Sequence, residues 1–193
     1  MLIKAKLQDV KRSLILDAAA AQFEALGYEQ FKIADLAKSV GVSVGTIYGM
    51  FESKEGLYMA YVRAQIAGYL AELESQCEEV HAPEEKLKAV FALKFGHFVS
   101  KRRAVEECAR NNPLFFSNIH YREAQLLERV YAKIAEIVRE INPALGREEG
   151  RRTAYLLIGL SDGYLSYWLA QGGDLQSQAA GLHTQMLAIV KGC

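Results

Sequence analysis

Apolar residues recur every three to four positions along most of the chain, which is the spacing of one buried helix face. From Leu7 to Leu26 they predict a helix that stops at Gly27. The same spacing predicts further helices over 33–40, 44–50, 53–80, 83–98, 105–111, 115–141 and 154–170, and a last one after Gly172 and Gly173. The sequence has no sustained alternation of apolar and polar residues, which a half-buried strand would need. The pattern therefore predicts an all-α protein of about nine helices.

Turn-forming and capping residues surround the two shortest predicted helices. Gly41 permits a left-handed turn between them, and Ser43 can cap the second. Ser53 can cap the long helix that follows. Ala37 and Gly41 are small enough for two helices to cross closely, above a small core. The expected members of that core are Ile33, Leu36, Val40, Val42, Ile47 and Phe51. These dimensions match a helix-turn-helix, but any pair of short helices with a glycine turn has them too.

The predicted helix 154–170 is apolar on every side, in contrast to the amphipathic helices before it. A small chain can usually cover only one face of such a helix, so a second subunit is expected to cover the other. This helix and the last one together predict a four-helix interface in a homodimer. Its expected residues are Tyr155, Gly159, Gly163, Tyr167, Leu182, Met186 and Ile189.

Charge and composition narrow the function classes. The chain has 193 residues, 51% of them hydrophobic, with Lys+Arg 23 balanced by Asp+Glu 23. This apolar content excludes a disordered chain, and the balance excludes a protein that coats nucleic acid along its whole surface. Residues 1–12 nevertheless carry Lys4, Lys6, Lys11 and Arg12 against Asp9. This basic arm suits contact with a DNA backbone or minor groove, with a frayed, solvated terminus as the alternative.

Cysteine usage and hydropathy indicate a soluble, cytoplasmic protein with no membrane contact. Cys77, Cys108 and Cys193 are odd in number and form no C-x-x-C pair, which argues against a disulfide framework or zinc ribbon. Cys77 and His81 lack a third nearby ligand, and the carboxylates beside Cys108 oppose thiol reactivity, so it is expected to pack. The N-terminus has no signal-peptide pattern, and helix 154–170 carries Asp162 in its middle. No metal or cofactor is expected.

One motif goes beyond spacing. Residues 41–57 read Gly-Val-Ser-x-Gly-Thr-Ile-Tyr-x-x-Phe-x-Ser-Lys-Glu-x-Leu, preceded by Ile15-Leu-Asp-Ala-Ala and Phe23-Glu-Ala-Leu-Gly-Tyr28. This stretch closely resembles the N-terminal domain of the tetracycline-repressor (TetR) family of bacterial transcription regulators. The resemblance covers about the first 60 residues and extends beyond them only as architecture.

The resemblance implies a three-helix DNA-binding domain over 1–53 and an effector-binding and dimerisation domain over 54–193, linked by helix 54–80. A dimer would bind palindromic, double-stranded operator DNA, most simply as a repressor, and a small-molecule effector would release it. The implied DNA contacts are Lys32, Val44, Gly45, Thr46, Tyr48, Gly49, Met50 and Lys54.

Residue chemistry supports several of these contacts. The hydroxyls of Thr46 and Tyr48 suit phosphate oxygens, and Lys54 begins a helix whose free N–H groups also favour an anion. Gly45 allows the helix backbone to approach DNA. The alternative for Tyr48 is a core aromatic ring.

The chain departs from its relatives at two places. Lys32 stands where they usually have a capping Thr or Ser, so the first short helix lacks a side-chain cap and Lys32 is free to touch a phosphate. Gly49 and Met50 replace larger residues and cannot make bidentate base contacts. Base reading is therefore expected from Thr46, thymine methyl contacts and DNA shape.

The second domain offers a candidate effector pocket and one rival function. Aromatic residues at helical spacing, with His97 and Asn118 as polar handles, predict a fairly apolar effector, although such residues can equally be core. They are Phe91, Phe95, Phe98, Phe115, Phe116, Tyr121, Tyr164 and Trp168.

The stretch Gly159-Leu-Ser161-Asp-Gly163 matches the G-x-S-x-G pattern of hydrolases, which needs a strand before it. A small-molecule enzyme built on the C-terminal helices is the alternative that this match raises. Two glycines four apart also suit close helix contact, with Ser161 and Asp162 hydrogen-bonded or at the edge.

Overall fold

The computed structural model of the protein describes residues 2–111 and 114–192. These residues form ten α-helices and no strand, which confirms the all-α prediction. The helices are α1 (Leu2–Leu26), α2 (Ile33–Val40), α3 (Val44–Phe51), α4 (Lys54–Glu79), α5 (Pro83–Ser100), α6 (Arg102–Asn111), α7 (Phe115–Arg122), α8 (Ala124–Ile141), α9 (Arg147–Gln171) and α10 (Leu175–Lys191).

The chain forms two compact units. The N-terminal unit consists of residues 1–65 and 101–111, and the C-terminal unit of residues 66–100 and 112–193. The single helix α4 begins in the first unit and ends in the second. Helix α6 belongs to the N-terminal unit, although it lies within the range that the sequence assigns to effector binding.

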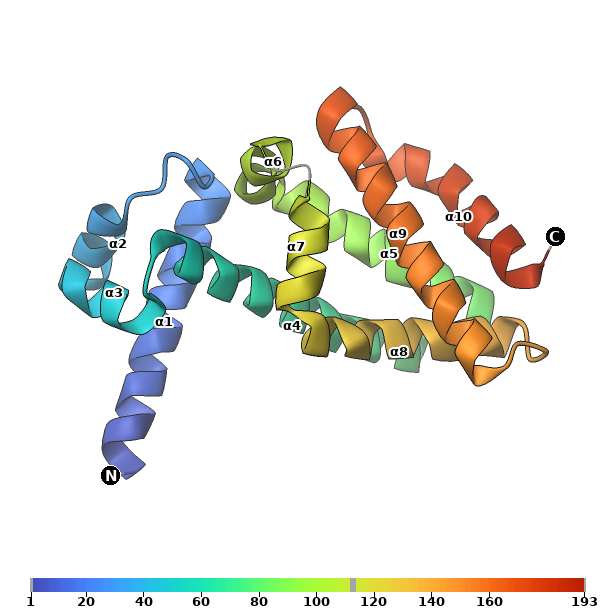
Figure 1. The fold of residues 1–193 in the computed structure, drawn as a ribbon, viewed down its shortest axis with the longest axis horizontal. Coiled ribbons are helices and arrows are strands. Elements are labelled where there is room, and N and C mark those ends of the chain that lie inside the picture. The colour runs from blue at the N-terminus through green and yellow to red at the C-terminus, as the bar shows by residue number, and fades with distance from the viewer. Residues whose placement is uncertain (1, 112–113, 193) are drawn as a thin grey trace. The chain divides into compact units, whose positions relative to one another are not determined.

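Several predicted helix boundaries are wrong: α1 begins at Leu2 instead of Leu7, and α6 begins at Arg102 instead of Val105. The predicted helix 115–141 is two helices, α7 and α8, which meet at Glu123 and run in different directions (Figure 1). Nothing in the local sequence marks the break, because no glycine or proline stands there. Helix α9 begins at Arg147, before the predicted start at Ala154. The apolar pattern misses its first turns because they are charged. Glu148 and Glu149 in its first turn suit the positive end of the helix dipole.

An aromatic core holds the N-terminal unit together. The ring of Phe23 stacks on Phe31 with centroids 4.1 Å apart and meets the edge of Tyr58 at 5.2 Å. Helix α6 closes this core from the side of α1: the Tyr58 hydroxyl donates to the Ala104 carbonyl at 2.9 Å, and Lys101 pairs with Glu24 at 2.7 Å. Long-range packing thus brings α6 onto α1 and the first turns of α4.

The expected N-terminal arm is helical. Residues 2–12 are the first turns of α1, which extend past α2 and α3 in Figure 1, and Lys6 and Lys11 are exposed. The Lys4 side chain lies outside the described part of the structure. The Arg12 guanidinium instead lies 4.3 Å above the Phe51 ring and donates to the Met50 carbonyl. This contact fixes α1 against the end of α3.

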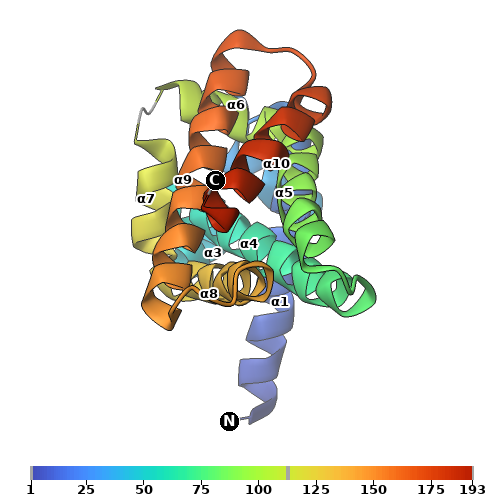
Figure 2. The same cartoon turned by 90° about the vertical axis from the view of Figure 1, so that its right-hand side faces the viewer.

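The C-terminal unit is a bundle in which α5 packs on α8 and α10, and α9 packs on α8 and α10. Figures 1 and 2 show α9 and α10 side by side. One face of α9 is buried through residues such as Leu157, Leu165 and Trp168, while Leu156 and Tyr167 on the other face are exposed. The helix therefore has the second apolar face that its sequence predicts. Among the helices described, none has the length and apolar character needed to span a bilayer.

The cysteines have structural surroundings where they are described. Cys77 is buried in α4, and His81 lies beyond the end of that helix. Burial raises the pKa of the Cys108 thiol, as do the charges of Glu29 and Glu107, although a hydrogen bond with Tyr58 lowers it. A raised thiol pKa agrees with the expected packing role of Cys108. Cys193 lies outside the described residues.

Candidate functional site

The turn between α2 and α3 follows its local sequence closely. Gly41 ends α2 with φ 69° and ψ 35°, the left-handed conformation that favours glycine. A Cβ built there would meet no described atom within 4 Å, so Gly41 serves the backbone angle and not a close helix crossing. The side chain of Lys32, which precedes α2, makes no capping hydrogen bond, as expected. Lys32 is exposed.

Ser43 fixes the start of α3. Its Oγ accepts a hydrogen bond from the Thr46 backbone N–H at 3.1 Å and lies 2.8 Å from the Thr46 hydroxyl oxygen. Ile47 and Phe51 point into the core. Val44, Gly45, Tyr48 and Gly49 are exposed, and half-exposed Thr46 and Met50 flank them. The Tyr48 ring is 45% exposed and so is not a core aromatic. One face of α3 is thus anchored in the core, while the opposite face is exposed and accessible to another macromolecule.

The connection from α3 to α4 is unusually tight. Glu52 has φ 67° and ψ −43°, and the Ser53 N–H donates to the Phe51 carbonyl at 2.7 Å, which makes a strained three-residue turn. The Ser53 Oγ accepts from the Gly56 N–H at 2.9 Å, so Ser53 caps α4 as predicted. A Cβ on Gly56 would lie 2.1 Å from the Phe51 carbonyl oxygen. Only glycine fits there.

Lys54 is engaged within the N-terminal unit. Its Nζ donates to the Glu29 carbonyl at 3.3 Å and lies 4.5 Å from the centre of the Tyr28 ring. These contacts tie the start of α4 to the loop between α1 and α2. In this conformation the expected phosphate contact of Lys54 would compete with both.

Five of the predicted effector residues contact one another in two sets of rings, which we together call the aromatic group. In the C-terminal unit, Phe98 and Phe116 lie 5.7 Å apart, Phe115 and Phe116 5.3 Å, and Phe95 and Tyr164 6.3 Å, between ring centroids. Phe91 and Trp168 are buried nearby in the same unit's core. Tyr121 is 87% exposed, which corrects its assignment, because its side of α7 faces away from the bundle.

The two expected polar handles, His97 and Asn118, have surroundings other than the aromatic group. His97 pairs with Glu72 at 2.9 Å and meets the edge of the Tyr69 ring. Asn118 is exposed. His97 is thus engaged with Glu72 and Tyr69, and Asn118 faces solvent.

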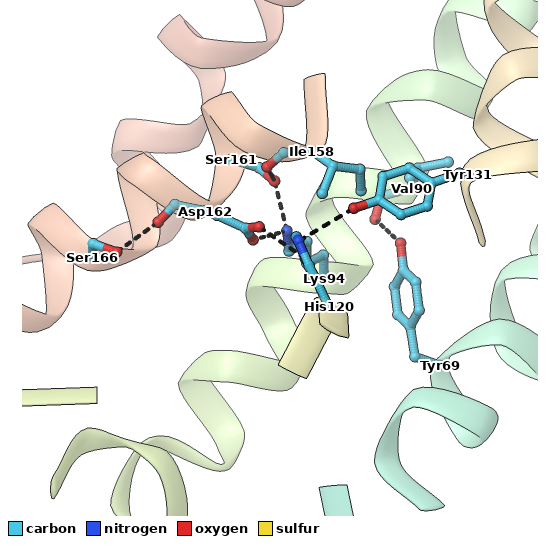
Figure 3. A network of polar contacts seen from close by, with 9 residues as sticks. All are labelled: Tyr69, Val90, Lys94, His120, Tyr131, Ile158, Ser161, Asp162 and Ser166. Carbon is cyan, nitrogen blue, oxygen red and sulfur yellow. Dashed lines mark hydrogen bonds and ion pairs between the residues drawn. The ribbon is translucent and has the colours of Figure 1, made fainter. Parts of the chain in front are cut away.

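A different polar cluster lies inside the C-terminal unit (Figure 3). Lys94 of α5 donates to the Asp162 carboxylate at 2.5 Å and to the Ser161 hydroxyl at 2.6 Å. His120 of α7 lies 3.2 Å from the other Asp162 oxygen. Its second ring nitrogen is 3.4 Å from the Tyr131 hydroxyl of α8. We call Lys94, His120, Ser161 and Asp162 the polar cluster.

The charges of the polar cluster support each other. Burial would raise the pKa of the Asp162 carboxyl, but the charge of Lys94 and the hydrogen bond from His120 hold it below its usual range. If His120 Nε2–H donates to Asp162, its Nδ1 accepts from the Tyr131 hydroxyl, so each ring nitrogen has a partner. The cluster joins the three helices α5, α7 and α9, and Tyr131 connects it to α8.

The sequence contained a partial signal for this cluster. The sequence leaves Ser161 and Asp162 either hydrogen-bonded or at the edge of a helix contact, and Lys94 interrupts the apolar face of the predicted helix 83–98. A charged residue on a buried face calls for a partner, but the identity of that partner depends on packing. His120 gave no such signal. Ser161 lies inside α9, with its hydroxyl donating to the Ile158 carbonyl, so the G-x-S-x-G match does not form a strand-to-helix turn.

The outer face of α9 is an apolar surface. With Ile189 of α10, it lines a shallow groove of about 880 Å³, bordered by charged residues of the first turns of α9. We call this the α9 face; its members are Tyr155, Leu156, Gly159, Leu160, Gly163, Tyr167 and Ile189. Leu182 and Met186 are buried in the core of their own chain, which corrects their assignment to an interface.

Comparison with known proteins agrees with this anatomy. A family model described as bacterial regulatory proteins, tetR family, matches residues 15–61. The chain is 29% identical over 191 residues to the HTH-type transcriptional regulator BetI of Serratia proteamaculans, covering 95% of this chain and 94% of BetI. It is 31% identical over 81 residues to the fatty acid metabolism regulator protein of Bacillus subtilis, 42% of either chain.

Solved structures share the fold. FadR of Bacillus halodurans, a fatty acid degradation regulator, has a TM-score of 0.67 at 22% identity over 90% of this chain and 96% of its own. FadR of Bacillus subtilis in complex with stearoyl-CoA has a TM-score of 0.66 at 22% identity, over 93% and 97%. The matched segment 15–61 contains the capped turn, the exposed face of α3 and the tight joint after it. Residues 15–61 thus match the tetR family of bacterial regulatory proteins, and over 95% of its length the chain is similar to the transcriptional regulator BetI.

Proposed function

We propose that this protein is a cytoplasmic, ligand-responsive repressor that binds a palindromic operator as a homodimer and has no catalytic role. Residues 1–53 would bind DNA, and residues 54–193 would bind the effector and the second subunit. The observation that carries the proposal is the division of α3 into an anchored face, Ile47 and Phe51, and an exposed face around Tyr48. In a dimer, two such faces would enter major grooves about 34–36 Å apart.

The exposed face of α3 presents little for direct base reading. Val44 can contact thymine methyl groups, and the Tyr48 hydroxyl can donate to a phosphate. Gly45 and Gly49 keep the backbone accessible. Sequence preference would therefore come partly from DNA shape.

The proposal predicts tight, specific binding to the DNA upstream of the protein's own coding sequence, measured by fluorescence anisotropy over a range of salt concentrations. Tyr48→Phe should weaken binding about fivefold to tenfold, because one phosphate hydrogen bond per subunit is lost. Tyr121→Phe is the matched control, since it removes an exposed hydroxyl from the C-terminal unit. A wild-type protein that binds this DNA no better than unrelated DNA would refute the proposal.

Lys32→Ser should separate stability from DNA affinity. A serine before α2 supplies the missing cap and should raise the free energy of unfolding by about 0.5–1 kcal/mol. Loss of a phosphate contact in each subunit should weaken operator binding and reduce its salt slope by about 2. Lys88→Ser, at an exposed lysine of the C-terminal unit, should leave the slope unchanged. An unchanged slope for Lys32→Ser would remove Lys32 from the interface.

The α9 face supports dimerisation. It gathers several exposed apolar side chains on one groove, and large exposed apolar patches of this kind mark interaction sites. The aromatic group of the C-terminal unit supports an apolar effector. Bacillus subtilis FadR, whose fold this chain shares, was solved in complex with stearoyl-CoA, a molecule with a long apolar chain.

Two segments connect the units along the chain. Helix α4 runs through both, and α6 of the N-terminal unit stands between α5 and α7 of the C-terminal unit in sequence. An effector that favours one arrangement of α4 or α6 would change the spacing of the two α3 helices. Release of DNA requires that the effector bind the two arrangements with different affinity.

A further inference from the structure

We propose that the polar cluster is the headgroup site of the effector and that the effector is an apolar carboxylate. In the structure, the carboxylate of Asp162 occupies the place that the carboxylate of the effector would take. This inference rests on the proposed function and adds to it the chemical class of the effector and its mode of entry.

The first argument is geometric. Donors from two other helices converge on the single carboxylate of Asp162: Lys94 at 2.5 Å on one oxygen and His120 at 3.2 Å on the other. Ser161 lies next to the ammonium, 2.6 Å from Lys94 Nζ. Figure 3 shows these side chains pointing toward one another from α5, α7 and α9. This is how proteins bind a carboxylate, with charge-assisted hydrogen bonds to both oxygens.

The second argument is energetic. The side chains of Lys94 and Asp162 are each only 12% exposed. Removing two charges from water is so unfavourable that well-packed apolar residues often stabilise a fold as much as a buried ion pair does. Stability alone therefore does not account for the pair. A recognition role does, because a buried ammonium that is held in place by an internal carboxylate can exchange that partner for the carboxylate of a ligand.

The third argument concerns the sign of the ligand charge. An ammonium has three N–H groups, and Asp162 and Ser161 take two of those of Lys94, which leaves one for a ligand oxygen among the described contacts. Both oxygens of Asp162 already accept hydrogen bonds. The cluster thus offers a charged N–H donor to a ligand oxygen, which is the group that an acid needs for binding.

The surroundings fit an acid with an apolar body. Phe95 follows Lys94 on α5, and Tyr164 is two residues after Asp162 on α9, with their rings 6.3 Å apart. Tyr131 is buried beside His120. The His120 side chain is 33% exposed, which makes it the open side of the cluster. A headgroup entering past His120 would meet Lys94 with its tail among aromatic rings.

Replacement of the Asp162 carboxylate by the carboxylate of the effector would also shift α7. When the effector takes Lys94, Asp162 loses its strongest partner, and its hold on His120 of α7 weakens. Helix α7 follows α6 directly in sequence, and α6 is packed on α1 of the N-terminal unit. The chain itself therefore connects the headgroup site to the DNA-binding unit.

Calorimetric titration of the full-length protein tests the inference. The probes are decanoate and palmitate, with the alcohol and the alkyltrimethylammonium ion of each chain length as references. We expect the acids to bind and the references to bind at least tenfold more weakly. Asp162→Asn should strengthen acid binding about tenfold, because the internal competitor loses its charge, whereas Lys94→Met should weaken it at least tenfold.

Controls separate a binding site from a structural role. Lys86→Met removes another α5 lysine, paired with Glu140 at 2.7 Å, and should leave acid binding unchanged. The double variant Lys94→Met/Asp162→Leu removes both buried charges together, so it should stay folded by circular dichroism and still fail to bind acids. Equal losses for Asp162→Asn and Lys94→Met would indicate a structural pair and overturn the inference.

Two further outcomes would overturn the inference. In the first, neither acid binds the wild type. In the second, the alkyltrimethylammonium ion binds the wild type, and Asp162→Asn abolishes that binding. Operator binding by the same protein preparation without any probe is measured in parallel. If operator binding is intact while the acids fail, only the headgroup assignment falls. If operator binding is absent, the proposed function falls whatever the titration gives.

Discussion

Replacing Gly56 with alanine is expected to destabilise the N-terminal unit by about 3 kcal/mol or more. The new Cβ would lie 2.1 Å from the Phe51 carbonyl oxygen and 3.3 Å from its carbon. Non-bonded heavy atoms do not approach so closely, so the backbone must move. Because whole domains are stable by about 5–15 kcal/mol, such a loss is a large part of the total.

The backbone at Phe51 has little freedom to move. Its ring is buried beneath the Arg12 guanidinium, and its carbonyl accepts the Ser53 N–H in the strained turn at Glu52. Shifting the carbonyl away from Gly56 would disturb α3 at its anchored end. We therefore expect Gly56→Ala to lose operator binding together with stability.

Gly49→Ala is the matched control. A Cβ there meets no described atom within 4 Å, and alanine favours a helix by about 1 kcal/mol over glycine. Urea denaturation followed by circular dichroism should show Gly49→Ala slightly more stable than the wild type and Gly56→Ala much less stable. Equal midpoints for Gly56→Ala and the wild type would show that the joint after α3 is not tight.

The parts of the fold that could be predicted from sequence are those that local interactions decide. The turn at Gly41 and the cap at Ser43 involve residues within a few positions of each other, and both are confirmed. The two-faced apolar character of α9 is also a property of one helix alone. In these cases the side chain, its partner and the backbone angle all belong to one short segment.

The parts that failed depend on distant segments. The bend at Glu123 follows from how α7 and α8 pack, because no residue there breaks a helix. The burial of Met186 depends on the neighbours of α10. The pairing of Lys94 with Asp162 joins residues 68 positions apart, and periodicity cannot say which polar residue meets a buried lysine. The spacing of residues along the chain therefore does not predict which distant residues come into contact.

The second large effect is expected at the α9 face. Leu160→Lys should convert the proposed dimer to a monomer at micromolar concentration, measured by native mass spectrometry. Leu160 is 36% exposed and stands beside Leu156, which is 64% exposed, in the middle of the apolar groove. A two-fold interface contains the substitution twice, so two ammonium groups would lose water close to each other.

Loss of the dimer should weaken operator binding about a hundredfold or more, because each monomer binds one half-site without help from the other. Tyr121→Lys is the control, because it puts the same charge at an 87% exposed residue of α7. It should leave both the dimer and the operator affinity unchanged. Since Leu160 lies on the exposed side of α9, Leu160→Lys should keep the wild-type helix content. A Leu160→Lys protein that remains dimeric would place the interface elsewhere. A monomer that binds the operator at full affinity would instead show that one copy of α3 is sufficient.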